Sequence, residues 1–245
     1  MSTAQVEKTS QQSDSAGDTW AAYWEEMEDR QHVFRIEARD YATRVRASLK
    51  LQPSFTILDF GCGFGHTSRE LATHVGRIAL WDASSQVRKQ ARDRIADVPN
   101  AELLDVEALD ASTLAGHFDV ILVHSVIQYM SIDEIREWLA RWRLMLKPGG
   151  RLVISDVIVP NAGGLQELLS YLFFALRHGF FWNALSAGVA EMGHYWKARR
   201  SRPLTTVSRS TIESWARDAG LKVSWLDKNL SHRQTRATLI LSTEQ

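Results

Sequence analysis

The sequence predicts a doubly wound α/β domain with a mostly parallel sheet. From residue 55 onward, short apolar runs alternate with amphipathic segments, which is typical of buried parallel strands with helices on both faces. Residues 57–65 read as a strand that runs into a glycine-rich turn, and open α/β sheets bind ligands at such turns. A Lys-Pro-Gly-Gly stretch at residues 147–150 ends a helical segment and precedes another apolar run, because proline and glycine interrupt helices.

Seven strands are expected, with helices between most of them. The apolar runs that predict the strands are residues 55–60, 77–81, 101–104, 118–123, 151–155, 222–226 and 235–241. Apolar spacing predicts the clearest helix at residues 132–146 and another at residues 208–219. We assign these elements to one domain, residues 51–245, which is long enough to bury a single large core.

Three segments lie outside this alternating pattern. Residues 1–18 are rich in Ser, Thr, Gln and Asp and are expected to be a flexible tail without the apolar core of a secretory signal. Residues 19–50 are predicted to form an N-terminal helical cap, since their apolar residues recur at three- and four-residue spacing. An aromatic-rich helical insertion at about residues 161–200 is predicted to be a lid after the fifth strand.

Composition and charge narrow the choice of partners. Lys and Arg total 29 and Asp and Glu total 29, so no global field attracts a polyanion, and nucleic acid is not expected as a partner. The single cysteine, Cys62, cannot form an internal disulfide, which fits residence in the reducing cytoplasm. Arg177, His178 and Gly179 interrupt the apolar stretch 168–182. Because a membrane span needs about 20 mainly apolar residues, no transmembrane segment is expected.

An acidic residue follows the glycine turn at a spacing typical of nucleoside sites. Gly61, Gly63 and Gly65 let the backbone bend with positive φ and let a ligand approach closely. Asp82 follows about 20 positions later, at the end of the second expected strand, where a carboxylate can bind both ribose hydroxyls. The glycines alone could form a purely structural turn, but together with Asp82 they predict a nucleoside site.

Two further residues favour S-adenosylmethionine over a dinucleotide. His66 replaces the Gly or Ala of the dinucleotide pattern, and the charge of Asp59 suits an ammonium group better than a pyrophosphate. The Asp-x-Gly-x-Gly-x-Gly pattern resembles the first motif of the class I S-adenosylmethionine-dependent methyltransferases, which have a Rossmann-like fold. The resemblance covers about residues 55–157 and continues through LWDAS at 80–84, LDVEAL at 104–109, FDVI at 118–121 and LKPGGRL at 146–152.

The resemblance implies S-adenosylmethionine as the cofactor and assigns most of its contacts. Asp59 and the backbone of the glycine turn would contact the methionine part, and Asp82 the ribose. Asp105 and the Val106 amide would contact the adenine, although Asp105 could equally cap a helix. The implied cofactor-binding residues, completed by the histidine at the end of the fourth strand, are Asp59, Gly61, Gly63, Gly65, Asp82, Ala83, Asp105, Val106 and His124.

The residues after the fourth expected strand disfavour two classes of methyltransferase. Residues 124–129 read His-Ser-Val-Ile-Gln-Tyr, whereas enzymes that methylate the amino groups of nucleic-acid bases carry Asn- or Asp-Pro-Pro-Tyr there. Catechol-type enzymes place an aspartate at this point to help hold magnesium, which needs oxygen ligands. A small-molecule acceptor, methylated without a metal, is the interpretation that remains.

Candidate catalytic residues follow from the chemistry of methyl transfer. Transfer from a sulfonium is an in-line displacement that gains rate from alignment, and a base is needed only when the acceptor must lose a proton. His124, His194 and Tyr195 are the candidate bases, although a lone histidine is more often structural. Aromatic residues suit an apolar or planar acceptor, methylated on O, N or C. The candidate acceptor-binding residues are Tyr23, Trp24, Tyr129, Tyr171, Phe181 and Trp182.

Several alternatives stay open at this stage. The insertion could be a lid, a homodimer surface, or a membrane-contacting helix that collects a lipid-like acceptor, and many of its aromatic residues could simply pack on the core. A nicotinamide-dependent oxidoreductase could use the same fold, although the sequence lacks a Tyr-x-x-x-Lys pair. A binding module could retain the nucleoside site without turnover.

Overall fold

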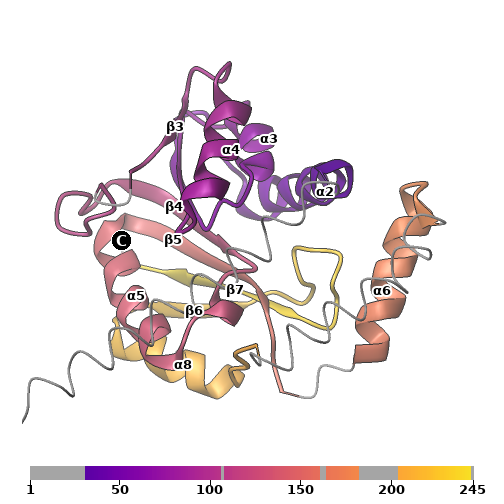
Figure 1. The fold of residues 1–245 in the computed structure, drawn as a ribbon. Helices are drawn as coiled ribbons and strands as arrows, with labels where there is room; N and C mark the ends of the chain where they lie inside the picture. Colours follow the sequence, from indigo (N-terminus) through magenta and orange to yellow (C-terminus); the bar gives the residue numbers. More distant parts are fainter. Residues whose placement is uncertain (1–30, 106–107, 161–163, 182–203, 244–245) are drawn as a thin grey trace, which may run out of the picture.

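Seven strands form one sheet at the centre of the domain (Figure 1). The structure is a computed structural model and describes residues 31–105, 108–160, 164–181 and 204–243. The strands are β1 (Thr56–Phe60), β2 (Arg77–Trp81), β3 (Ala101–Leu103), β4 (Phe118–His124), β5 (Leu146–Val157), β6 (Lys222–Trp225) and β7 (Ala237–Ser242).

The order of the strands confirms the predicted doubly wound sheet. They lie in the order β3-β2-β1-β4-β5-β7-β6. β1 runs parallel to β2 and β4, and β5 runs parallel to β4, whereas β7 is antiparallel to both β5 and β6. The two halves of the sheet wind in opposite directions from the centre, so a topological switch point lies between β1 and β4.

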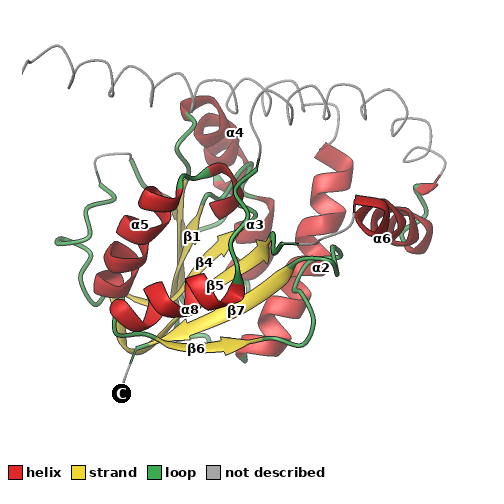
Figure 2. Cartoon of the chain, turned by 90° about the horizontal axis from the view of Figure 1, so that it is seen from below, coloured by secondary structure: helices red, strands yellow, loops and turns green. Residues whose placement is uncertain are grey.

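Helices cover both faces of the sheet, as Figure 2 shows. One face is packed by α2 (Gln31–Leu49), α3 (His66–Ala72) and α4 (Ser85–Ile95), and the other by α5 (Ile132–Met145) and α8 (Arg209–Asp218). Successive side chains of a strand point to opposite faces. In β4, Ile121 and Val123 therefore join the core with α5, while Val120 and Leu122 join the core with α2 and α3.

Capping residues account for the starts of three helices. The Ser131 hydroxyl accepts the Glu134 N–H, and the Glu134 carboxylate accepts the Ser131 N–H, which forms a capping box at the start of α5. Ser84 and Ser208 cap α4 and α8 with their hydroxyls. α5 and α8 therefore begin and end within one residue of the boundaries that the sequence predicted.

β5 begins earlier than expected. Residues 147–150 were expected to be a turn before the strand, but they lie within β5, which starts at Leu146. Leu146 pairs with Phe118 at the beginning of β4, and the register then shifts before Val120 pairs with Arg151. The early pairing of Leu146 explains why the Lys-Pro-Gly-Gly segment belongs to the strand.

The insertion after β5 includes α6 (Gly164–Arg177), which packs against α2 to one side of the sheet (Figure 1). Phe174, Ala175 and Phe180 are buried there. The opposite side of α6 exposes apolar side chains: Leu168, Leu169, Phe173 and Leu176.

Much of the expected cap and lid lies outside the described residues, namely residues 1–30, 161–163 and 182–203. The tail, the first part of the cap and most of the lid therefore stay predictions. Among the residues that are described, no helix combines the length and the apolar character needed to cross a membrane.

Candidate cofactor and acceptor site

The glycine turn and the end of β4 lie side by side at the switch point of the sheet. Phe60, the last residue of β1, pairs with Val123 of β4, so Gly61 and His124 follow on neighbouring strands. Ligands of open α/β sheets bind at this position. The structure therefore brings together two segments that the sequence predicted to form one site.

Gly63, in the middle of the glycine turn, leaves room for a ligand, and its N–H binds a carboxylate. Gly61, Gly63 and Gly65 all have positive φ. Among the described residues other than its two chain neighbours, none has a heavy atom within 4 Å of a Cβ atom built at Gly63, so a ligand can approach the backbone there. The Gly63 N–H donates to Oδ2 of Asp82 at 3.0 Å, which fixes this carboxylate beside the turn.

Gly61→Ala is expected to destabilise the fold by about 1–3 kcal/mol through backbone strain, with a further cost from a clash. Gly61 has a φ of 73°, and a Cβ atom would lie 2.3 Å from Cγ2 of Val126. Gly116→Ala is the matched control, because Gly116 has a φ of 63° and open space around it. Urea unfolding should show a larger loss at Gly61, partly restored by Val126→Ala. Equal losses at the two glycines would contradict the clash.

Asp82 lies just beyond β2, and backbone N–H groups bind both of its carboxylate oxygens. Oδ1 accepts the Ser84 N–H at 3.0 Å, and burial raises the pKa of the carboxyl. Arg88 donates to the carbonyl oxygens of Asp82 and Ala83 at 2.7 and 2.9 Å. The turn after β2 is therefore held in one conformation, with its carboxylate next to Gly63.

The residues assigned to the adenine lie beyond β3. The Asp105 side chain is 77% exposed and lies 3.7 Å from the guanidinium of Arg92. Val106 lies outside the described residues. The adenine contact of Asp105 therefore stays a prediction.

Asp59 is a buried carboxyl within β1, next to the glycine turn. Its residue is 3% exposed, and the Ser68 hydroxyl of α3 donates to Oδ2 at 2.5 Å. Burial raises the pKa of Asp59 to about 6, although the Ser68 hydrogen bond opposes the shift. A cation bound nearby would favour the ionised carboxylate.

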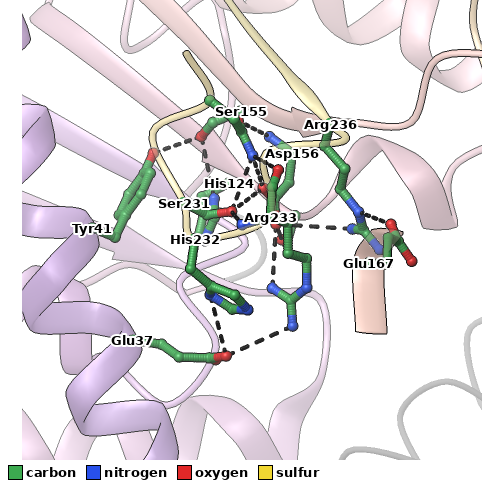
Figure 3. A network of polar contacts seen from close by, with 12 residues as sticks. Glu37, Tyr41, His124, Ser155, Asp156, Glu167, Ser231, His232, Arg233 and Arg236 are labelled. Carbon is green, nitrogen blue, oxygen red and sulfur yellow. Dashed lines mark hydrogen bonds and ion pairs between the residues drawn. The ribbon is translucent and has the colours of Figure 1, made fainter. Parts of the chain in front are cut away.

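His124 forms part of a chain of three side chains at the ends of β4 and β5 (Figure 3). Nδ1 of His124 lies 3.2 Å from Oγ of Ser155, and Oη of Tyr41 lies 2.7 Å from the same Oγ. The Tyr41 ring stacks on His124 with centroids 3.9 Å apart. Burial lowers the pKa of His124 to about 4, so the ring is neutral at physiological pH.

Asp156 lies at the centre of the polar network drawn in Figure 3. Its carboxylate has no exposed surface. It accepts hydrogen bonds from Ser125 Oγ at 2.6 Å, Ser231 Oγ at 2.5 Å and Asn229 Nδ2 at 2.6 Å. Burial alone would raise its pKa, but nearby cationic groups and the Ser125 hydrogen bond outweigh burial and hold the pKa well below its usual range.

Two arginines connect this network to the helices around it. Arg233 lies 3.4 Å from Asp156 and 3.7 Å from Glu37 of α2. Arg236 lies 3.8 Å from Asp156 and donates to Glu167 of α6 at 2.8 Å. The loop between β6 and β7 therefore ties α2 and α6 to the end of β5 (Figure 3).

His232, in the same loop, is packed between α2 and α6. Its ring stacks on Phe174 with centroids 4.4 Å apart, and Nδ1 lies 3.6 Å from Glu37. Burial lowers the pKa of His232 to about 3.

The buried histidines are expected to make folding stability sensitive to acid. An unfolded histidine takes up a proton near pH 6.5, whereas His124 and His232 do so only near pH 4 and 3. The stability linked to the neutral rings is therefore complete above pH 6.5 and is lost as the pH falls through the folded pKa values. Urea unfolding at several pH values should show a shallower decline for His232→Gln, with the exposed His117→Gln as control. An unchanged decline in His232→Gln would contradict this cause.

The structure brings some predicted acceptor residues to this network and leaves others undescribed. Tyr129 lies in the short 3-10 helix η2 (Ile127–Tyr129) and is one of the groups that raise the pKa of Arg233. The Tyr171 ring centroid is 6.0 Å from that of His232, and Phe181 is half-buried. The candidates outside the described residues are Tyr23, Trp24, Trp182, His194 and Tyr195.

The sequence analysis missed most of the polar network. Ser155 and Asp156 follow the same strand-end rule that singled out Asp82 and His124, so their position was a usable signal. The other members carry no local motif, because they come from separate segments of the chain. These missed residues are Glu37, Tyr41, Glu167, Asn229, Ser231, His232, Arg233 and Arg236. Ser68, which bonds to Asp59 outside the network, was also missed.

No group of three His, Cys, Asp or Glu side chains is placed to hold a metal ion within the described part of the chain. Cys62 is buried, and burial raises the pKa of its thiol well above the usual range. Methylation without a metal stays a prediction.

Comparison with known proteins indicates the same family as the motifs. The sequence model of a family described as "Methyltransferase domain" matches residues 58–152. A carboxy-S-adenosyl-L-methionine synthase of Pseudomonas putida is 31% identical over 147 residues, which is 56% of this chain and 60% of that protein. An uncharacterized protein of a Streptomyces fradiae transposon is 34% identical over 125 residues, which is 49% of this chain and 35% of that protein.

Solved structures share the fold. A putative methyltransferase of Haloferax volcanii, in complex with its activator Trm112, has a TM-score of 0.60 and 19% identity, covering 93% of this chain and 96% of that one. The YcgJ protein of Bacillus subtilis has a TM-score of 0.56 and 18% identity, covering 76% and 70%. Residues 58–152 form a methyltransferase domain, and the fold is the Rossmann-like fold of class I methyltransferases. This chain spans 35% to 60% of the length of the curated relatives named above.

The glycine turn of this methyltransferase domain fits S-adenosylmethionine, the cofactor that the sequence motifs imply. Gly63 offers open space for the ligand, Asp82 presents a fixed carboxylate next to it, and Asp59 is a buried acid beside the same turn. A sulfonium cofactor with an ammonium group is complementary to two carboxyls in a site that already raises their pKa.

Proposed function

We propose that this protein transfers the methyl group of S-adenosylmethionine to a small molecule with an apolar or aromatic body. The observation that carries the proposal is the position of the polar network at the ends of β4 and β5, beside the glycine turn at the switch point. A methyl donor held by the glycine turn after β1 would face His124 and Ser125, which lie at the end of the neighbouring strand β4. The balanced charge of the chain supports a small-molecule partner rather than nucleic acid.

Each part of the site has a distinct task in the proposed reaction. S-adenosylmethionine supplies an electrophilic methyl group on a positively charged sulfur. Asp59 holds the methionine part of the cofactor and Asp82 its ribose, so that the methyl group between them is aligned for displacement. α2 and α6, which Arg233 and Arg236 tie to the end of β5, wall off the acceptor side and exclude water.

The acceptor region combines apolar and polar surfaces. Tyr171 and His232 contribute aromatic rings, and Tyr129 lies near Arg233. An acceptor with a planar or apolar body and one polar group would match this lining. A lipid-like acceptor stays an alternative, because α6 exposes Leu169 and Phe173 on its outer side.

Asp82→Ala is expected to weaken the binding of S-adenosylhomocysteine about ten- to a hundred-fold, the loss of hydrogen bonds to a charged group. Isothermal titration calorimetry measures the affinity. Asp110→Ala is the control, because the Asp110 carboxylate is exposed and pairs with Ser112. Unchanged affinity in a folded Asp82 variant would contradict the ribose contact.

A substrate screen tests the activity itself. Purified protein is incubated with methyl-labelled S-adenosylmethionine and a small-molecule extract, and the products are separated by liquid chromatography. Label transferred by the wild type but not by Asp82→Ala would support the proposal. Tight cofactor binding without any labelled product across broad extracts would favour the binding-module alternative.

A second candidate function comes from the relatives named carboxy-S-adenosyl-L-methionine synthase, several of which are 28% to 31% identical over about half of this chain. As the alternative to methyl transfer, we propose carboxylation of the cofactor: its S-methyl carbon loses a proton and bonds to CO2 released by a carboxylic-acid co-substrate. Mass spectrometry of the cofactor released from the purified protein separates the two functions. A carboxylated cofactor would indicate the second, and unmodified S-adenosylmethionine or its demethylated product the first.

A further inference from the structure

Tyr41, Ser155 and His124 form a buried chain of hydrogen bonds that ends at the acceptor side of the site. The Tyr41 residue is 1% exposed and Ser155 is 1% exposed. The Ser155 hydroxyl lies 2.7 Å from Tyr41 Oη and 3.2 Å from His124 Nδ1. Among the residues that the structure describes, neither hydroxyl has another hydrogen-bond partner.

Counting hydrogens along this chain fixes the direction of its bonds. Tyr41 and Ser155 have one hydroxyl hydrogen each, and a neutral histidine carries one N–H, on either Nδ1 or Nε2. If Nδ1 carried the hydrogen and donated to Ser155, one of the two buried hydroxyl hydrogens would have no acceptor. Buried polar hydrogens are almost always bonded, because an unpaired one costs about 1–3 kcal/mol.

Only one arrangement satisfies every buried hydrogen. Tyr41 donates to Ser155, and Ser155 donates to Nδ1 of His124. The ring hydrogen of His124 must then lie on Nε2. Burial raises the pKa of Tyr41 far above its usual range, which keeps the phenol protonated and able to donate.

The Nε2 atom of His124 is the free end of the chain. Among the described residues it has no hydrogen-bond partner. It is also not one of the polar atoms that are both buried and without a partner, so part of its surface is exposed. It is therefore accessible to a ligand. Because Ser155 already occupies the lone pair on Nδ1, the ring offers an N–H to the site and no free lone pair.

We propose that His124 donates a hydrogen bond from Nε2 to an oxygen of the acceptor, and that the acceptor binds as an oxygen anion such as a carboxylate or phenolate. This inference rests on the proposed methyl transfer and names its substrate class. His124 is then a catalytic residue that acts as a donor, not as the base that the sequence suggested. Tyr41 and Ser155 are positioning residues that hold its tautomer.

The surrounding charges are consistent with an anionic acceptor group. The Arg233 side chain is 31% exposed and lies 3.4 Å from Asp156, so it places a positive charge at this side of the site. Asp156 is already bound by two hydroxyls, an amide and Arg233, and Glu167 is bound by Arg236. The titratable groups whose charges act on His124 are Asp156, Arg233 and Arg236.

The proposed chemistry balances without a base. A lone pair of the acceptor oxygen forms the new bond to the methyl carbon, while the carbon–sulfur bond breaks and its electron pair goes to sulfur. The positive charge of the sulfonium and the negative charge of the oxygen are both neutralised. No proton leaves the acceptor in this step, so a histidine without a free lone pair is no obstacle.

The tautomer of His124 can be measured without any acceptor. Full-length protein labelled at its histidine nitrogens is saturated with S-adenosylhomocysteine, and long-range proton–nitrogen correlation spectra are recorded near pH 7, with His124→Gln to assign the signal. The wild type is expected to carry its hydrogen on Nε2. Ser155→Ala should shift the population toward Nδ1, Tyr41→Phe should retain Nε2–H because Ser155 can still donate, and the exposed Ser112→Ala should change nothing. A wild-type ring with its hydrogen on Nδ1, or with both nitrogens protonated, would overturn the proposal.

The substrate class is tested with benzoate as the anionic probe and benzylamine as its cationic counterpart. Benzoate should shift the Nε2–H signal of His124 and benzylamine should not. His124→Gln, which keeps an N–H donor, should bind benzoate within a few-fold of the wild type. His124→Leu should bind it about ten- to a hundred-fold more weakly. Preference for benzylamine, no shift with benzoate, or equal affinity in the leucine variant would overturn the anionic acceptor. Neither readout needs turnover, so they fail independently of the methyl-transfer assay.

Discussion

Asp156→Ala is expected to lower the free energy of unfolding by roughly 3–5 kcal/mol, the cost of removing one partner from a buried ionic network. The Asp156 carboxylate has no exposed surface and accepts hydrogen bonds from Ser125, Ser231 and Asn229. The Arg236 side chain, 3.8 Å away, is only 5% exposed. Its charge would lose a buried counterion in the variant. Urea unfolding followed by tryptophan fluorescence measures the loss.

Asp156→Asn separates the charge from the shape of the side chain. Asp156 has a φ of 65°, a conformation that asparagine tolerates better than alanine. The asparagine variant should therefore lose the ionic contribution with little backbone strain and fall between the wild type and Asp156→Ala. Asp97→Ala, which removes an exposed partner of Arg69, should leave the stability close to that of the wild type. An unchanged free energy of unfolding in both Asp156 variants would show that the network around Asp156 does not stabilise the fold.

The pH dependence of this loss follows from the depressed pKa of Asp156. A carboxyl whose pKa is lower in the folded than in the unfolded protein contributes stability that is present above the unfolded value, about 3.9. That contribution is lost as the pH falls through the folded pKa. The difference between wild type and Asp156→Asn should therefore persist at neutral pH and shrink only in strong acid.

The fold was predictable because its determinants are local and repeated. Each parallel strand is a short apolar run, and α4, α5 and α8 each begin at a capping serine: Ser84, Ser131 and Ser208. The glycine turn and Asp82 were predictable because each directly follows one short apolar strand, β1 or β2, so a local pattern marks both. β5 differs because the pairing of Leu146 with Phe118 depends on a neighbouring strand, which local patterns do not contain.

The residues on the acceptor side were less predictable, because they meet only through contacts between distant segments of the chain. Glu37, Asp156, Glu167 and Arg233 come from α2, β5, α6 and the loop before β7, and no periodic pattern links such distant segments. The run at residues 229–236 looks like an ordinary polar connection. Its serine, histidine and arginine side chains acquire a role only once the β6–β7 pair brings them to Asp156.

Asp59→Asn is expected to have opposite effects on stability and on cofactor binding. Burial raises the pKa of Asp59 to about 6, so ionising this carboxyl at neutral pH opposes folding. Keeping this buried carboxyl ionised at neutral pH costs roughly 3 kcal/mol of folding free energy. The asparagine oxygen can still accept the Ser68 hydroxyl without carrying a charge. The cofactor-free variant should therefore be more stable than the wild type.

The sign of the pH dependence identifies the cause of this gain. A carboxyl whose folded pKa is raised contributes stability that is fully present below its unfolded pKa and is lost as the pH rises through about 6. The advantage of Asp59→Asn should therefore be near zero around pH 4 and approach its full size around pH 8. Asp119→Asn is the matched control. The Asp119 carboxylate pairs with Lys147 and the Thr56 N–H, so this variant should lose stability instead.

Calorimetric titration of Asp59→Asn with S-adenosylmethionine should show an affinity at least about ten-fold lower than that of the wild type, since the ammonium group loses its charged partner. A gain in stability that is equal at pH 4 and pH 8 would show that packing, not charge, causes it. Unchanged affinity for S-adenosylmethionine would show that Asp59 does not bind the methionine part.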